Sequence, residues 1–180
     1  MDKNTDKIDI SWHLAKNDVE LQLVNFEFLF WRTYYNCIRW QEDCQSCIAD
    51  DHLTAHEIAI LHIIRMKERP KSIYEIGRLL NRDDTPNIQY GIKKLIALNY
   101  IRKVDVKSDK MKKAIAYQIT EEGIKNTDAY TQARNNILLN IIKEYNQNEL
   151  QFEEAKKTLF TMKGLYEEAS RLVASFKTDS

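Results

Sequence analysis

The middle of the chain contains three helical segments in close succession, and each begins with its own start signal. The stretch LTAHEIAILHIIRMK predicts a helix with Thr54 as N-cap and Glu57 completing a capping box. KSIYEIGRLLN repeats the signal with Ser72 as cap. In the third stretch, Thr85 precedes Pro86, which suits the first position of a helix, so Thr85 is the predicted N-cap. Short helices packed this closely must share one small core.

Two segments of alternating polarity follow the third helix. YIRKVDV and KAIAYQIT predict strands, and the polar run KSDKMK predicts the turn between them. TEEGIKNTDAY then predicts a further helix starting at Thr120. The order of helix, helix, short turn, helix and β-hairpin predicts a winged helix-turn-helix.

The two ends of the chain carry long apolar seams at spacings of three and four residues, which place each seam along one side of a helix. The first seam consists of Leu23, Phe26, Phe30, Thr33, Cys37, Trp40, Cys44 and Cys47. The second consists of Phe152, Ala155, Leu159, Met162, Tyr166, Ala169, Val173 and Phe176. Such seams favour a homodimer joined through the terminal helices, and an ordinary intramolecular core is the alternative.

The predicted fold is therefore mainly α-helical with a small β-hairpin wing, and long N- and C-terminal dimerisation helices flank the winged helix. The expected boundaries are an N-terminal arm over 1–17, a dimerisation helix and linker over 18–52, the winged helix over 53–123, and C-terminal dimerisation helices over 124–180. Only four Gly and two Pro interrupt the chain, which is consistent with a largely helical protein.

The charges are unevenly distributed although the net charge is zero. Residues 61–113 contain 14 basic and 6 acidic side chains, whereas residues 1–60 contain 5 basic and 11 acidic ones. A basic balance confined to the middle of the chain predicts that this part meets a polyanion. The charged N-terminus lacks the apolar core of a signal peptide, and no apolar run is long enough to cross a bilayer. We therefore expect a cytoplasmic protein with no membrane association.

The run from LTAHEIAILHII through SIYEIGRLLN, NIQYGIKKLIALNYIRKV and YQITEEG resembles the MarR family of transcriptional regulators. The resemblance covers roughly residues 53–123. It implies a dimer that binds double-stranded DNA, with repression expected rather than activation. It also allows a small-molecule effector between the dimer helices and the DNA-binding lobes, although no residue set in the sequence identifies one.

The third helix of the middle region carries most of the candidate DNA contacts. Asn87 and Gln89 could pair bidentately with adenine, whereas Lys93 and Lys94 suit phosphates. The acids Asp83 and Asp84 would repel phosphates unless Arg82 or Lys71 neutralises them, or they could accept from cytosine. The full set of predicted DNA-binding residues is Ser72, Arg82, Thr85, Asn87, Gln89, Tyr90, Lys93, Lys94, Lys110, Lys112 and Lys113.

The predicted wing departs from the pattern of the family it resembles. Many members carry Asp-x-Arg at the wing tip, which places an arginine in the minor groove. Here the turn reads SDKMKK, without arginine. Because lysine lacks the planar fork of arginine, we expect Lys110, Lys112 and Lys113 to contact the phosphate backbone rather than read sequence.

Other chemistry is weakly supported. Cys37 and Cys44 are two helical turns apart, ~10 Å along the axis, which is too far to share a metal ion. We therefore expect Cys37, Cys44 and Cys47 to be buried core residues, with metal binding or a redox role as minor alternatives. His52, His56 and Glu57 do not form H-E-x-x-H, and no P-loop, G-x-S-x-G or dinucleotide motif is present. The sequence predicts no enzyme and no cofactor. A winged-helix adaptor that binds protein instead of DNA remains the alternative function.

Overall fold

The computed structural model describes residues 13–107, 113–145 and 152–178. The chain divides into two compact units, residues 1–135 and 136–180. The elements of the first unit are α1 (Asp18–Ser46), α2 (Ala55–Arg65), η1 (Met66–Glu68), α3 (Ile73–Leu80), α4 (Thr85–Ala97), β1 (Ile101–Lys107), β2 (Lys113–Ile119) and α5 (Glu121–Arg134). A short π-helical stretch, η2 (Asn135–Leu139), leads into the second unit, whose helices are α6 (Asn140–Tyr145) and α7 (Phe152–Thr178).

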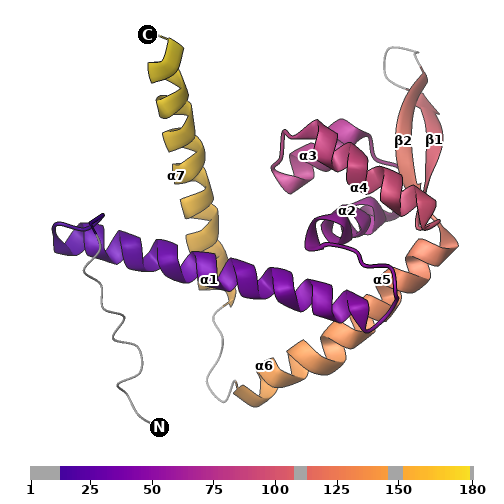
Figure 1. Ribbon diagram of the computed structural model, residues 1–180, viewed down its shortest axis with the longest axis horizontal. Helices are drawn as coiled ribbons and strands as arrows, with labels where there is room; N and C mark the ends of the chain where they lie inside the picture. The colour runs from indigo at the N-terminus through magenta and orange to yellow at the C-terminus, as the bar shows by residue number, and fades with distance from the viewer. Residues whose placement is uncertain (1–12, 108–112, 146–151, 179–180) are drawn as a thin grey trace. The chain divides into compact units, whose positions relative to one another are not determined.

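The core of the first unit is built around α2, which packs against α1, α3, α4, α5 and β2 (Figure 1). The helix can have neighbours on several sides because its sequence, AHEIAILHIIR, is apolar around most of its circumference. The buried aliphatic side chains of this core are Ile58, Ile60, Leu61, Ile64, Ile76, Ile88, Ile92, Leu95 and Ile101. This core confirms the predicted helix-turn-helix.

Two of the three predicted helix caps are confirmed and the third is wrong. Thr54 and Glu57 form both halves of the capping box, and the Ser72 hydroxyl accepts from the Glu75 amide at 3.2 Å. Thr85, however, is the first residue of α4, and Asp84 occupies the cap position without a side-chain cap hydrogen bond. The Asp84 carboxylate is not available as a cap because it is bound by neighbouring side chains.

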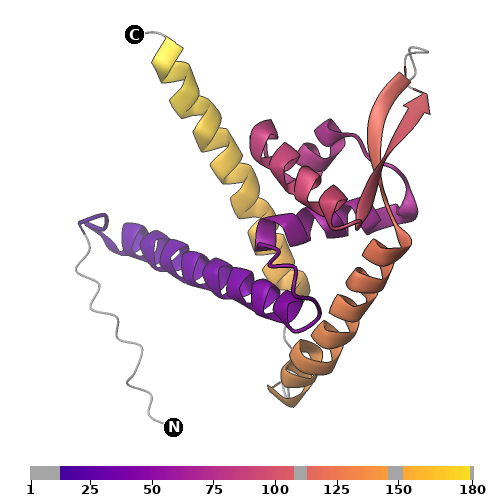
Figure 2. The ribbon, with the colours of Figure 1, turned by 45° about the vertical axis from the view of Figure 1, so that its right-hand side comes forward.

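The predicted strands form an antiparallel hairpin whose register runs from Ile101 opposite Ile119 to Lys107 opposite Lys113. The hairpin extends beyond α2, α3 and α4 in both views (Figures 1 and 2). Its base is held by Lys71, which precedes α3 and exchanges two backbone hydrogen bonds with Tyr117, at 2.8 and 2.9 Å. The start of α3 and the wing are therefore parts of one hydrogen-bonded structure.

Lys71 is fully buried, although its sequence context is basic and polar. Its ammonium group donates to the carbonyl oxygens of Ile64 and Arg69, each at 3.1 Å, and to that of Met66. Burial, together with the charge of Arg69, lowers the pKa of Lys71. The side chain thus closes the end of α2. The prediction that Lys71 could neutralise the acids before α4 is therefore wrong, because its ammonium group is bound elsewhere.

A second polar cluster joins the end of α1 to the start of β1. One oxygen of Asp51 accepts from the Gln45 amide at 2.7 Å and from the Tyr100 hydroxyl at 2.8 Å. The other oxygen accepts from the Leu53 amide at 3.2 Å. Burial and the nearby Asp51 carboxylate raise the pKa of Tyr100 to about 12. Because Gln45 and Tyr100 are both buried, this cluster fixes α1 on the winged helix.

The helix α1 confirms the predicted N-terminal helix, but much of its apolar seam is exposed. Leu23 and Phe30 are about half exposed, at 48% and 45%. In the second unit, α7 likewise exposes large apolar side chains along its length, including Leu159, Leu165 and Val173. None of the helices in the described part of the chain is long and apolar enough to span a membrane.

Candidate nucleic-acid interface

The turn between α3 and α4 is short because the two helices approach each other at a glycine. A Cβ on Gly77 would lie 2.8 Å from the carbonyl oxygen of Arg82 and 3.3 Å from the Ile88 side chain. Asn81 ends α3 in the left-handed conformation, with φ of 55°, and the Arg82 amide donates to the Gly77 carbonyl at 2.9 Å. This geometry fixes where α4 begins relative to α3.

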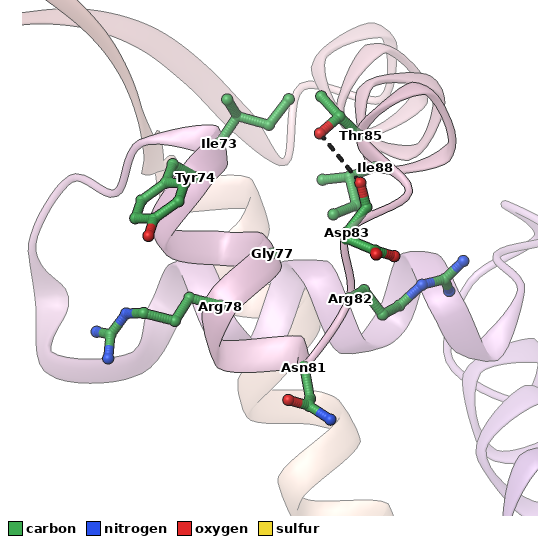
Figure 3. Close-up of a pocket in the computed structure, with 9 residues that line it drawn as sticks. All are labelled: Ile73, Tyr74, Gly77, Arg78, Asn81, Arg82, Asp83, Thr85 and Ile88. Carbon is green, nitrogen blue, oxygen red and sulfur yellow. Dashed lines mark hydrogen bonds between the residues drawn. The ribbon is translucent and has the colours of Figure 1, made fainter. Parts of the chain in front are cut away.

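A pocket of about 560 Å³ opens beside this turn (Figure 3). Tyr74 and Arg78 lie on the α3 side, one helical turn apart, while Asp83 and Thr85 lie toward α4. Tyr74 is 79% exposed and the Arg78 side chain is also exposed. Neither Tyr74 nor Arg78 is among the residues predicted from the sequence. The sequence did contain a signal for them: they are four residues apart on the polar face of a strongly amphipathic helix, so they lie side by side on its surface.

The start of α4 contains a chain of polar contacts. The Arg82 guanidinium donates from Nε to the Asp84 carboxylate at 2.7 Å and makes a second contact to its other oxygen. Asp84 also accepts from the side-chain amide nitrogen of Asn87 at 2.9 Å. Hydrogen bonds from Arg82 and Asn87 hold the pKa of Asp84 well below its usual range. Arg82 thus neutralises Asp84, which was one of the alternatives predicted from the sequence.

Arg82 also anchors this chain of contacts to α2. Its guanidinium lies 2.8 Å from Nδ1 of His56. Because arginine only donates, Nδ1 must accept, which places the imidazole proton on Nε2. Nε2 is buried and has no hydrogen-bond partner among the described residues. Burial and the charge of Arg82 both lower the pKa of His56, which favours the neutral imidazole that this contact requires.

The outer face of α4 is polar and its inner face is apolar. Asn87, Gln89, Tyr90 and Lys93 are exposed, and Tyr90 is 70% exposed. The inner residues of α4 belong to the core described above. The exposed side chains occupy consecutive turns of one helix, as expected for a helix that enters the major groove.

Lys94 differs from its neighbour Lys93. Its ammonium group lies 2.9 Å from the carboxylate of Glu57 and 2.7 Å from the carbonyl oxygen of His52. Glu57 is buried, so this ion pair joins the start of α2 to the last turn of α4. Of the two predicted phosphate contacts on this helix, Lys94 therefore has a partner inside the protein, whereas Lys93 is exposed on the outer face.

The remaining predicted contacts are distributed as follows. Ser72 caps α3, and Thr85 lies beside the pocket at the turn. Lys110 and Lys112 lie outside the described residues, and Lys113 pairs through its backbone with Lys107 in the hairpin. Arg82 and Thr85 therefore line the pocket at the turn, and Asn87, Gln89, Tyr90 and Lys93 are exposed on α4. The predicted wing contacts remain a prediction.

The cysteines only partly follow the expectation of a buried core position. Cys44 is buried, and burial together with the nearby Cys47 raises the pKa of its thiol. Cys37 and Cys47 are exposed, so the prediction that all three are buried is wrong. Cys37 lies within α1 and Cys47 directly after its end, on either side of the buried Cys44 in the sequence. Within the described ranges, no three His, Cys, Asp or Glu side chains are grouped so that they could hold a metal ion.

A second pocket, of about 450 Å³, lies between α1, α2 and α5. Its wall includes Gln41 from α1, His62 from α2, and Tyr130 and Arg134 from α5. The His62 and Tyr130 rings meet edge to face, with centroids 4.7 Å apart. Burial and the nearby arginines, Arg65 and Arg134, lower the pKa of His62. The pocket thus has aromatic side chains, His62 and Tyr130, and the positive charge of Arg134 in its wall.

Comparisons with known proteins agree with this geometry. Residues 53–123 match the family profile described as "Winged helix DNA-binding domain". Among curated protein sequences, none matches the chain significantly. The fold is similar to that of Staphylococcus aureus MarR solved with salicylate and kanamycin, at 17% identity and a TM-score of 0.65 over 83% of this chain and 95% of that one.

Two further solved structures with the same fold contain DNA. The S. aureus MepR–DNA complex is 15% identical, with a TM-score of 0.62 over 78% of this chain and 96% of that one. An Escherichia coli MarR cysteine-to-serine mutant complexed with operator DNA is also 15% identical, with a TM-score of 0.58 over 83% and 99% of the two chains. At these identities the similarity establishes a MarR-like fold with a winged-helix domain.

The different surroundings of Lys93 and Lys94 give a test of the interface geometry. Replacing Lys94 with Ala leaves the buried Glu57 carboxylate without its ammonium partner, so we expect a decrease of about 1–3 kcal/mol in the free energy of unfolding. Lys93→Ala is the matched control and should change it by no more than about 0.5 kcal/mol. Urea denaturation followed by circular dichroism at pH 7 measures both. Equal effects of the two substitutions would contradict the assignment of Lys94 to the interior.

Proposed function

We propose that this chain, with its winged-helix domain at residues 53–123 and its MarR-like fold, is a sequence-specific transcriptional repressor that binds operator DNA as a homodimer. The single observation that carries the proposal is the face of α4, where the early turns expose Asn87, Gln89 and Tyr90 while the opposite side is anchored in the core. Side chains of this kind at the start of the second helix of a helix-turn-helix reach base edges in the major groove. Repression requires only that the bound dimer block access to the promoter.

The electrostatics also favour DNA. Asp84, one of the two acids before α4, is paired with Arg82, so its charge does not repel a phosphate as an unpaired carboxylate would. Arg78 and Lys93 remain exposed on the two helices of the motif. We assign Lys93 to phosphate contacts and Gln89 to a base. Lys110, Lys112 and Lys113 are the proposed contacts of the wing with the phosphate backbone.

Binding-site selection from random duplex DNA tests the proposal. The protein should enrich a pseudo-palindrome whose half-sites are ~10 bp apart, centre to centre. On the selected site, Gln89→Ala should weaken binding by roughly 1–3 kcal/mol for each base that Gln89 reads, with little change on random DNA. Lys93→Ala, the control for a phosphate contact, should weaken binding to both kinds of DNA. It should also reduce the salt slope by about two in a symmetric dimer.

Two outcomes would contradict these assignments. Enrichment of no motif would favour the winged-helix adaptor that binds a protein instead of DNA. A Gln89→Ala variant with unchanged specific binding would remove Gln89 from the base contacts. Transcription in vitro from a promoter that contains the selected site should fall as the protein is added, and a rise would identify an activator.

The proposed homodimer rests on the exposed seams of the terminal helices. α1 and α7 are 29 and 27 residues long, and each exposes large apolar side chains that a soluble monomer would leave in water. Covering such seams with a second copy is the usual solution for long amphipathic helices. Two copies related by a two-fold axis would also present two α4 helices to successive major grooves.

We expect sedimentation at micromolar concentration to show a dimer. Phe30→Glu places a charge in the exposed α1 seam and should shift the population to monomer, because burying an unpaired carboxylate is costly. Asn36→Glu is the matched control, since Asn36 is exposed on the same helix but lies off the seam. A wild-type chain that sediments as a monomer would contradict the dimer, and equal effects of both variants would contradict the role of the seam.

The pocket between α1, α2 and α5 is our candidate for the effector site. Arg134 can pair with a carboxylate while Tyr130 and His62 contact an aromatic ring, so we propose a small aromatic acid of the salicylate class.

Titration with salicylate, followed by calorimetry, tests this site. Arg134→Ala should weaken binding by about tenfold or more, which corresponds to the removal of a charge-assisted hydrogen bond. Arg78→Ala, an arginine outside the pocket, should leave the affinity unchanged. Absence of binding at millimolar salicylate, or binding that does not depend on Arg134, would contradict the assignment.

A further inference from the structure

We propose that Arg82 and Asp84 act as positioning residues that fix the orientation of the Asn87 side-chain amide, so that Asn87 selects adenine over guanine at one position of each half-site. This inference rests on the proposed DNA-binding function. It concerns how the interface distinguishes bases, and it assigns a role in specificity to two side chains that need not touch a base themselves.

The geometry leaves Asp84 little freedom. Arg82 binds both of its carboxylate oxygens and is itself held by Nδ1 of His56 on α2. The side chains of Arg82 and Asp84 are only about one-third exposed, although they lie at the start of a surface helix. The carboxylate that meets Asn87 is therefore fixed to the core of the domain through His56.

A fixed carboxylate determines the orientation of the amide. An ionised carboxylate can only accept hydrogen bonds, so the amide group of Asn87 must direct its nitrogen toward Asp84. The observed distance from Nδ2 to the Asp84 oxygen is 2.9 Å. Rotating the amide by half a turn would bring its oxygen against the carboxylate, which is repulsive. The oxygen and the second N–H of Asn87 remain available because the side chain is exposed.

An amide fixed in this way distinguishes the two purines. In the major groove, adenine presents an amino group beside the N7 acceptor, whereas guanine presents two acceptors, O6 and N7. The amide oxygen and the second N–H match the adenine pattern. Guanine would place O6 against the amide oxygen, and the amide cannot rotate to relieve this without breaking its bond to Asp84. A free asparagine could turn its amide so that only the NH2 group faces guanine and donates to O6 or N7.

The neighbouring acid provides a matched control. Asp83 also lies just before α4, and its carboxylate makes no hydrogen bond or ion pair to another residue in the part of the chain that the structure describes. Asp83→Ala and Asp84→Ala remove the same charge from almost the same place. Only the second substitution releases Asn87. Neither removes a side-chain cap from α4, because the described residues provide none there.

The experiment first selects binding sites from random duplex DNA with the wild-type protein and identifies the position at which Asn87→Ala changes the purine preference. Affinities are then measured for duplexes with adenine or guanine at that position. The wild type should prefer adenine by roughly 5- to 150-fold. Asp83→Ala should retain this ratio, and Asp84→Ala should reduce it to within about threefold of unity. Adding Asp84→Ala to Asn87→Ala should not change the ratio further, since Asp84 acts through Asn87.

The possible failures are distinguishable. If the wild type enriches no motif, the proposed DNA-binding function fails and this inference fails with it. If a motif is enriched but Asn87→Ala changes the purine preference nowhere, only the present inference is overturned. If Asp83→Ala and Asp84→Ala change the ratio equally, the acids act through their charge alone, which also overturns the positioning role. Thermal unfolding of each variant confirms that the compared proteins are folded.

Discussion

The contact between α2 and α4 determines where the candidate recognition surface lies. Glu57 caps the start of α2 through the Thr54 amide and, from the same buried position, pairs with Lys94 on α4. Gly91 lets the helices approach closely, because a Cβ there would lie 2.8 Å from the Ile60 side chain. A carboxylate in this position must keep its partners, since an unpaired buried charge is costly. The ion pair between Glu57 and Lys94 thus fixes the position of α4 along its axis. Gly91, which has no side chain, allows α4 to lie close to α2.

The same region connects the recognition surface to α1. Asp51 joins the end of α1 to Tyr100 at the start of β1, and the Glu42 side chain of α1 accepts from the Ala55 amide at 2.9 Å. Immediately after Asp51 in the chain, the His52 carbonyl accepts from Lys94 of α4. A displacement of α1 would therefore have to break these hydrogen bonds or carry α4 with it. In the proposed homodimer, such coupling would allow an event at the α1–α2–α5 pocket to alter the spacing of the two α4 helices proposed to contact DNA.

The sequence predicted much of the fold because its strongest signals are local. The predicted caps at Thr54 and Ser72 and the predicted helix start at Thr120 depend on residues within a few positions of one another. The same holds for the alternating strands and the apolar spacing of α1. The cap at Thr85 was misplaced by one residue because Asp84 is engaged by side chains on either side of it. Sequence spacing does not show which of several neighbouring polar groups will pair.

The candidate site was less predictable because its decisive contacts join distant segments. Nothing near Lys94 in the sequence indicates that its partner is Glu57, 37 residues earlier. The contact of Arg82 with His56 spans 26 residues. Tyr74 and Arg78 were missed because polar residues on a helix surface are common, and only the three-dimensional position of α3 beside the turn distinguishes these two.

The burial of Lys71 has a consequence for how this position tolerates change. In the sequence it looks like one more charge in a basic region, where arginine or glutamine would be equivalent. In the structure its ammonium group replaces the solvent that would otherwise hydrate three carbonyl oxygens at the end of α2 and in the following turn. The planar guanidinium of arginine cannot reproduce a compact ammonium that donates in three directions, and a neutral side chain cannot supply three donors. Among natural variants, lysine should therefore persist here as a core residue does, and amine-directed labelling reagents should modify it only when the domain unfolds.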